Sequence, residues 1–422
     1  MTAAQSMAGR RRLSQAELDM IITAHEKFVT GKQGGKRASL RFMNLSGLDM
    51  SFRNLIDADL AGSVLDGCRM VRTKLDRASL FGADLRQADL RQAVLIRADL
   101  RGACLRGANL SQADLTQADF REGQIAIPHP RKGLDVVRHE TRNGEVDEVN
   151  FSGATLDGSQ FAGVSAFKAD FSDCSMRGAK LAGANLKEAN LSGAILDGAD
   201  VKGANLEGAN FTGAVMSGVD TSTARVHGAT LGGALVGSSP AAVGKAQELY
   251  QRCLDNQVWC QTGGKSGTPA RLDGEDLRPL GDRLKGLRMT ALSAKGACLV
   301  GLDLSGAQLQ GANLQNADLR AVNLRGADLR GAKLTGANLT KADLRQVILS
   351  PLPLGPDRQT PANLGSARLR YTMLQSADLS EAVFDGADLR GSDFTGARLS
   401  RTSFRDCDVG QAHGLDFGQT AG

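Results

Sequence analysis

The chain is poor in aromatic residues, which make up only 4% of its 422 residues, with one Trp and two Tyr. A globular core of this size normally relies on aromatic side chains, so small and aliphatic side chains must fill the interior. Proline is also scarce at 9 residues, while hydrophobic residues reach 41%. That composition excludes a disordered chain. Gly, in contrast, reaches 51 residues, and the combination indicates repetition.

The chain also lacks long apolar runs and paired cysteines. No run approaches the roughly 18 apolar residues that a membrane span needs, so we expect no membrane partner. Arg10–Arg12 precede Leu-Ser-Gln-Ala-Glu and not the apolar part of a signal peptide. The seven Cys have no paired spacing, and we interpret them as reduced thiols of a cytoplasmic protein. The net charge is +5, and most of the excess lies in residues 1–37.

A five-residue repeat dominates what is present. From Leu40 onward a large apolar residue recurs at every fifth position, usually with Ala two residues before it and Asp or Asn between them, as in Ala83-Asp84-Leu85. Gly often follows two residues later. The repeat has about 60 centres. They lie in residues 40–125, 151–236, 284–349 and 364–409.

The repeat predicts a coiled, extended chain. Within one unit the Ala and the Leu are two residues apart, so both point inward from an extended segment, and the Asp or Asn between them points outward. A chain that turns at each Gly-containing corner coils around a narrow core. Stacked coils then pair their backbone groups as parallel strands do.

The A-[D/N]-L-x-x pattern resembles that of the pentapeptide-repeat family. The resemblance implies an all-β solenoid, a right-handed quadrilateral parallel β-helix with four units in each coil. On that geometry the repeats form about 15 coils, stacked over roughly 70 Å. The best-known activity of the family is binding of type II topoisomerases through an acidic surface that imitates DNA. Here residues 151–236 carry only two more acidic than basic residues.

The interruptions of the repeat divide the chain. Asn143-Gly144 favours a tight turn, so we predict a β-hairpin with its arms in 134–149, and four prolines in 350–363 predict a Pro-rich loop in place of two repeats. The expected parts are a basic arm with a capping helix (1–37), a first β-helix (38–236) with a hairpin insertion near 126–150, a helical insert or second cap (237–283), a second β-helix (284–410) with the Pro-rich loop, and a tail (411–422).

Two helices are expected to cover β-helix ends, because an open end exposes unpaired strand edges and apolar side chains. Ser14 and Glu17 form a capping box before the first helix, and Ser239-Pro240 begins the second. The two predicted apolar faces are Leu18, Ile21, Ile22, His25 and Phe28, and Leu249, Tyr250, Cys253, Leu254 and Val258. The C-terminal end has no such helix, so its own tail or a second copy in a homodimer would cover it.

The two helical segments also align with each other, which indicates an internal duplication of helix, Gly-rich turn and solenoid. Thr30-Gly31 matches Thr262-Gly263, and at the same offset Leu18 falls on Tyr250. After a short insertion, Leu45 falls on Leu284.

Arginines that follow the central Leu are the candidate binding surface. Because residues twenty apart would stack on one face, these side chains form ladders that would suit phosphates. An outward Asp two residues earlier offers most of them a local partner, which favours a self-neutralised face. The candidates are Arg86, Arg91, Arg101, Arg106, Arg121, Arg320, Arg325, Arg330 and Arg345.

Catalysis and cofactor binding have little support in the sequence. The five His have no Ser, Cys or carboxylate partner at a recognisable spacing. Cys253 and Cys260 lie on one helical face without a third ligand, which favours buried hydrophobes over a metal site. We therefore predict no catalytic residue, cofactor or metal.

The sequence leaves three functions open. The first is a non-enzymatic scaffold for an unknown protein partner, the second is a factor that binds or protects a topoisomerase such as DNA gyrase, and the third is nucleic-acid binding through the basic arm and the Arg ladders.

Overall fold

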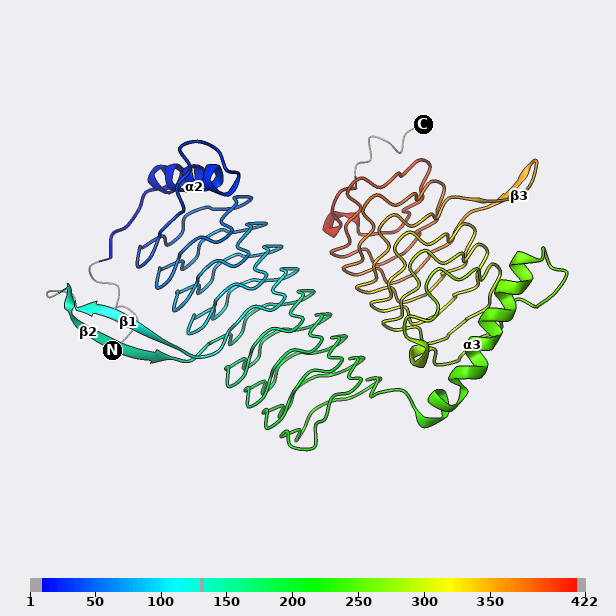
Figure 1. The fold of residues 1–422 in the computed structure, drawn as a ribbon, viewed down its shortest axis with the longest axis horizontal. Helices are drawn as coiled ribbons and strands as arrows, with labels where there is room; N and C mark the ends of the chain where they lie inside the picture. The colour runs from blue at the N-terminus through cyan, green and yellow to red at the C-terminus, as the bar shows by residue number, and fades with distance from the viewer. Residues whose placement is uncertain (1–9, 130–132, 416–422) are drawn as a thin grey trace. The chain divides into compact units, whose positions relative to one another are not determined.

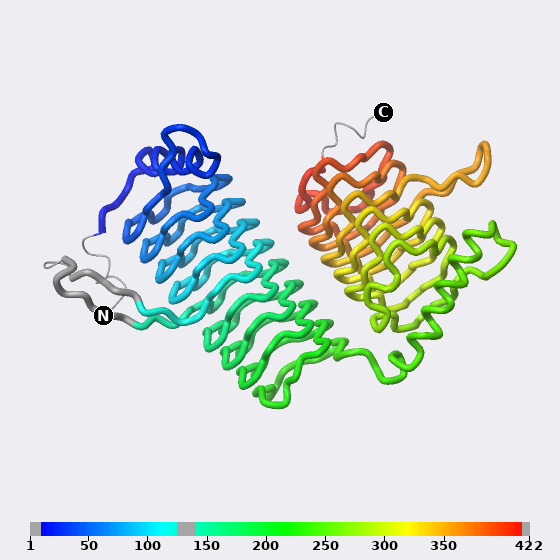
Figure 2. The backbone as a smooth tube through the Cα atoms, viewed as in Figure 1, coloured from blue at the N-terminus to red at the C-terminus, as the bar shows by residue number. Residues whose placement is uncertain are grey.

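The computed structural model describes residues 10–129 and 133–415. The chain divides into two compact units, Met1–Gly237 and Ser238–Gly422. Each unit contains one stack of coils, coloured blue to green in the first unit and yellow to red in the second (Figures 1 and 2). Both stacks are right-handed quadrilateral β-helices, as the resemblance of the repeat implies.

Each coil contains four five-residue units, and the coils pair through their outward residues. Ser39 pairs with Asp59 and Asp59 with Ser79, in parallel and twenty residues apart, a spacing that holds wherever no insertion interrupts the coils. The amide of Leu60 donates to the carbonyl oxygen of Ser79 in the next coil at 2.8 Å. Each corner is a tight turn in which the third residue has a positive φ, such as Gly82 at 61°. This geometry explains why Gly is frequent at this position, although other residues such as Gln87 at 55° occupy it in many units.

The inward positions form a continuous core in each unit. The Ala and Leu of each repeat are almost all fully buried. Several phenylalanines lie in the coils on either side of the hairpin insertion. There the ring centres of Phe120 and Phe161 are 4.4 Å apart, and those of Phe151 and Phe171 are 5.0 Å apart. Small and aliphatic side chains thus fill most of the core. Aromatic rings gather at the first insertion and, with Phe384, Phe394 and Phe404, near the C-terminal end of the second stack.

Helix α2 (Gln15–Val29) covers the N-terminal end of the first stack (Figure 1). The predicted capping box is confirmed, because Ser14 accepts from the Glu17 amide and the Glu17 carboxylate accepts from the Ser14 amide at 2.8 Å. The buried face of the helix is narrower than the predicted one. It contains Leu18, Ile22 and His25, while Phe28 is 47% exposed.

Helix α3 (Pro240–Gln261) lies beside the first coils of the second stack (Figure 1). Its N-cap is Ser239, as predicted, and its buried residues include Leu249, Cys253 and Asn256. Val258, predicted on the buried face, is 40% exposed.

The two caps correspond with a shift of one residue from the sequence alignment. Leu18, Ile22 and His25 in α2 have the same spacing as Leu249, Cys253 and Asn256 in α3. Leu18 therefore corresponds to Leu249 and not to Tyr250. The turn after each helix contains a glycine at the equivalent position. A Cβ on Gly35 would meet the Phe28 backbone, and a Cβ on Gly267 would meet the backbone of Trp259.

The first insertion is an antiparallel hairpin of β1 (Gly123–His129) and β2 (Gly133–Arg142). The predicted turn at Asn143-Gly144 is wrong, because this pair follows the hairpin and leads back into the stack. Gly144 is required there for another reason, since a Cβ would lie 1.9 Å from the carbonyl oxygen of Phe120. The repeat then resumes at Val146, earlier than the predicted Phe151.

The predicted Pro-rich loop is a second, shorter hairpin of β3 (Leu352–Gly355) and β4 (Arg358–Thr360). It leaves the stack at one corner, and the coil continues with Lys333 paired to Asn363. The second stack begins earlier than predicted, because Arg271 already pairs with Ser293. A 3₁₀ turn at Arg278–Leu280 lies within its first coil.

The C-terminal ends of the two stacks differ. In the first unit Val226, Leu231 and Val236 of the last coil are 43%, 55% and 67% exposed. In the second unit the chain folds over its own end, through the 3₁₀ turn Val409–Gln411 and a bridge between His413 and Asp393. The described part of the predicted tail thus covers this end.

Candidate interaction surface

The nine candidate arginines lie on the faces of the two stacks at the corner positions that follow the inward Leu. Because Asp84 pairs with Cys104 and Asp99 with Asp119, Arg86 lies one coil from Arg106, and Arg101 one coil from Arg121. The predicted stacking geometry is therefore present.

Seven of the nine arginines bind the Asp of their own repeat. In each, Nε and Nη2 donate to the two carboxylate oxygens, a bidentate geometry in which Arg is the strongest partner for a carboxylate. In Arg86 the two distances to Asp84 are 2.7 and 2.6 Å. The seven pairs are Arg86–Asp84, Arg91–Asp89, Arg101–Asp99, Arg121–Asp119, Arg320–Asp318, Arg330–Asp328 and Arg345–Asp343.

The backbone explains why the pair forms inside one unit. Residues two apart in an extended segment point to the same side, so an outward Asp and the corner Arg after the Leu share a face. The Asp also accepts from the backbone amide of the Arg, as in Asp89 and Arg91 at 3.3 Å. Hydrogen bonds from Arg91 lower the pKa of Asp89, and the same bonds raise the pKa of Arg91. Both groups are held in their charged forms.

Arg106 and Arg325 have looser partners. The residue two before Arg106 is Cys104, and the nearest carboxylate is Glu148 at 3.8 Å. The residue two before Arg325 is Asn323, and the Nε of Arg325 donates to Gln346 Oε1 at 3.4 Å. These two side chains are the candidates on which an anion would meet the least competition.

Sequence reasoning missed three arginines of the same kind. Arg278 binds Asp276 and Arg390 binds Asp388, each at 2.7 Å, and Arg370 reaches Asp388 from the neighbouring coil at 2.6 Å. The signal for the first two was present, because both have the same Asp-Leu-Arg order as six of the seven paired candidates.

The coils after the first hairpin have a different outward row. Asn190 Nδ2 donates to Asp170 at 3.0 Å, and Asn205 Nδ2 donates to Asn185 at 3.2 Å. Thr230 continues the row by donating to Asn210 at 3.0 Å. The bonds run between coils and carry little net charge. The twenty-residue spacing of Asn in this stretch was the signal for them.

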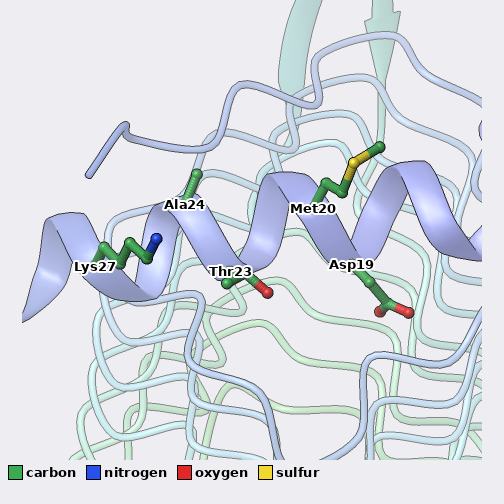
Figure 3. Close-up of a pocket in the computed structure, with 5 residues that line it drawn as sticks. All are labelled: Asp19, Met20, Thr23, Ala24 and Lys27. Carbon is green, nitrogen blue, oxygen red and sulfur yellow. The ribbon is translucent and has the colours of Figure 1, made fainter. Parts of the chain in front are cut away.

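A shallow hollow on the outer side of α2 is lined by Asp19, Met20, Thr23, Ala24 and Lys27 (Figure 3). All five belong to one helix, and Met20 is 66% exposed. Beneath it Arg53 of the first coil donates to Thr23 and pairs with Asp19 at 3.3 Å. The lining contains no His, Cys or Ser, and Arg53 already holds both Thr23 and Asp19.

Within residues 10–129 and 133–415, no three His, Cys, Asp or Glu side chains are grouped so that they could hold a metal ion. In the same residues, no helix is both apolar and long enough to cross a membrane.

Comparison with known proteins agrees with this architecture. A family model described as pentapeptide repeats matches residues 36–124, 147–220, 293–350 and 362–401, which together are more than half of the chain. No curated protein matches the chain.

Several solved structures are similar to parts or most of the chain. One is QnrB1, a plasmid-mediated fluoroquinolone resistance protein, with 19% identity, a TM-score of 0.24, and coverage of 46% of this chain and 85% of that one. HetL from Nostoc sp. strain PCC 7120 has 19% identity, a TM-score of 0.17, and coverage of 92% and 95%. Rfr23 from Cyanothece 51142 has 26% identity, a TM-score of 0.20, and coverage of 28% and 85%.

Proposed function

Because the chain belongs to the pentapeptide-repeat family, we propose that it is a non-enzymatic scaffold that binds another protein through the faces of its β-helices. The observation that carries this proposal is the cancellation of charge inside the repeats, where Asp and Arg two residues apart neutralise each other. The result is a set of long, regular and polar faces. Stacked repeats commonly present such extended surfaces to protein partners.

The same pairing argues against a phosphate-binding face. Binding to nucleic acid depends on cations that contact phosphates and release counterions. In most of the candidate ladder each guanidinium already holds a carboxylate in bidentate geometry, so a phosphate would have to displace it. Imitation of DNA is equally poorly supported, because it needs a strong acidic excess and residues 38–125 carry 12 basic and 11 acidic residues.

The two hairpins are the features of each unit that break the regular surface, and we assign partner specificity to them. Both project from a corner of their own stack (Figure 1). At its base, Leu352 of the second hairpin packs against the corner at Gly331, where a Cβ would come within 2.7 Å of it. Leu354 near its tip is 49% exposed.

Affinity capture with hairpin variants tests the proposal. The full-length protein serves as bait in an extract of its source cells, treated with nuclease and at moderate salt. One variant replaces residues 124–141 and a second replaces 352–360, each with a short Gly-Ser link. We expect one protein at defined stoichiometry with the native chain and its loss with at least one variant. A protein that is captured from the untreated extract but not from the nuclease-treated extract would contradict a protein scaffold.

The topoisomerase alternative has a separate test. Supercoiling by purified gyrase is measured with and without a high excess of this protein, and with a quinolone present. We expect unchanged activity, because the described faces lack the acidic excess that imitation of DNA requires. Inhibition or quinolone protection at stoichiometric amounts would favour the alternative instead.

A further inference from the structure

His25 is a fully buried, titratable side chain at the contact between helix α2 and the first coil. Its Nδ1 accepts from the backbone amide of Ala38 at 3.1 Å, and its Nε2 lies 2.9 Å from the carbonyl oxygen of Ile56. Ala38 is the first inward residue of the stack, and its own carbonyl oxygen accepts from Asp59 at 3.1 Å. The imidazole therefore ties the cap to the first strand of the β-helix.

The two contacts allow only one neutral form of the ring. A backbone amide can only donate, so Nδ1 must present its lone pair, and a carbonyl oxygen can only accept, so Nε2 must carry the hydrogen. Protonation would place a second hydrogen on Nδ1, directly against the Ala38 amide. The cap contact is thus compatible with neutral His25 and incompatible with the imidazolium.

The charged groups around the ring do not compensate for this. Burial lowers the pKa of His25, the bond to the Ile56 carbonyl opposes that effect, and Arg37 lowers the pKa further. Glu26 on the same helix and Asp57 of the first coil favour the charged ring. Both carboxylates already hold an arginine, however, Glu26 with Arg53 and Asp57 with Arg77. Phe28, at 6.1 Å between ring centres, adds no charge.

Asn256 occupies the corresponding position in the second unit. It is also fully buried. Its Oδ1 accepts from the Ala270 amide at 3.0 Å, and its Nδ2 donates to the carbonyl oxygen of Thr290 at 3.1 Å. Oδ1 thus replaces Nδ1 of His25, and Nδ2 replaces its Nε2. An amide makes both bonds without titrating between pH 5 and 8.

We propose that protonation of His25 releases helix α2 from the first coil, so that the N-terminal cap of the first β-helix loosens in mild acid while the cap of the second stays closed. Loosening exposes the backbone edge of the first coil. Because the native ring is harder to protonate than an unfolded one, its stabilising effect is complete above the ordinary value near pH 6.5. The effect is lost progressively as the pH falls from there toward the lower native value.

Hydrogen exchange of the full-length protein tests this inference, with mass spectrometry of peptides that contain Ala38 and Ala270. Protection factors, corrected for the intrinsic pH dependence, are compared between about pH 7.5 and about pH 5.5. We expect protection of Ala38 to fall, by up to about tenfold per pH unit within the window. Protection of Ala270 should stay constant.

Two reciprocal substitutions supply the matched controls. His25→Asn gives the first cap the side chain of the second and should make Ala38 protection independent of pH. Asn256→His should transfer the pH dependence to Ala270. If Asn256→His does not fold, the native chain and His25→Asn decide by themselves. The proposal is overturned if Ala38 protection in the native chain does not change with pH, or if the change persists in His25→Asn.

Discussion

The coils before the first hairpin and the coils after it satisfy their outward polar groups in different ways. Before it, Asp84, Asp89, Asp99 and Asp119 each bind an Arg of the same repeat. After it, asparagines bond from one coil to the next, as Asn205 does to Asn185. Both stretches share the same fold and the same inward Ala and Leu.

The difference shows what the outward position requires. A carboxylate only accepts hydrogen bonds, so carboxylates stacked in adjacent coils cannot bond to each other and need another donor, which before the hairpin is the Arg of their own unit. An Asn side chain has both donors and an acceptor and can continue a row between coils. Charge pairing within a coil and amide pairing between coils are therefore alternative solutions to one problem.

The largest effect is expected at the boundary between the two stretches. Phe161→Ala removes a fully buried ring that stacks on Phe120 across the hairpin insertion. We expect a loss of about 3–5 kcal/mol in the free energy of unfolding, measured by denaturant titration. Leu231→Ala, at a 55% exposed position, is the control and should cost less than about 0.5 kcal/mol. Equal losses would contradict the role of the Phe cluster.

A carboxylate placed in the asparagine row tests whether the two solutions can be exchanged. Asn190→Asp removes the donor to Asp170 and sets two carboxylates in adjacent coils. We expect a loss of about 1–2 kcal/mol at neutral pH. Adding Ser192→Arg rebuilds an Ala-Asp-Leu-Arg unit and should restore at least half of it. Failure of the second substitution to rescue would show that the pair needs more than its own repeat.

Removal of one charge pair should have a smaller, pH-dependent effect. Asp89→Asn ends the bidentate contact with Arg91, whose side chain is 53% exposed, so we expect a loss of about 0.5 kcal/mol. Because the native pKa of Asp89 is lowered, the native advantage is present above the ordinary value near 3.9 and is lost as the pH falls below it. Unfolding curves of the two proteins should converge in acid and differ at pH 7. A difference that persists at low pH would contradict the charge-pair origin.

The smallest effect is expected for Arg106→Ala. Glu148 lies 3.8 Å away, and the Arg106 side chain is 62% exposed. We expect a change below about 0.3 kcal/mol by the same denaturant titration. A larger loss than for Asp89→Asn would mean that Arg106 has a stabilising role beyond this ion pair.

Much of the fold could be predicted from the repeat alone, because the five-residue spacing places Ala and Leu inward without contacts from distant residues. The same spacing located the bidentate pairs, since an Asp two before an Arg shares its face. Tertiary contacts decided the rest. Asn143-Gly144 resembles a hairpin turn in sequence, yet Gly144 is needed for its close approach to Phe120, which only the folded stack reveals.

The caps illustrate the same limit. Periodicity placed both helices, but it assigned Phe28 and Val258 to the buried faces, and both are substantially exposed. A helix that covers the narrow end of a stack buries only one row of side chains, spaced by about one helical turn. The equivalence of His25 and Asn256 was also hidden, because the end of α3 is one residue longer: Asn256 lies six residues before the C-cap Thr262, whereas His25 lies five residues before the C-cap Thr30.

Binding of duplex DNA tests the central claim, that Asp–Arg pairs inside the repeats occupy most of the candidate cations on the faces. The native protein is titrated into labelled duplex at about 50 mM salt and compared with two triple variants of equal net charge. One variant breaks the pairs, with Asp84→Asn, Asp89→Asn and Asp99→Asn. The other leaves them intact, with Asp66→Asn, Asp76→Asn and Asp114→Asn.

We predict salt-sensitive binding by the pair-breaking variant, and no binding by the native protein or by the control variant. Native protein that binds the duplex as tightly as the pair-breaking variant would contradict the account.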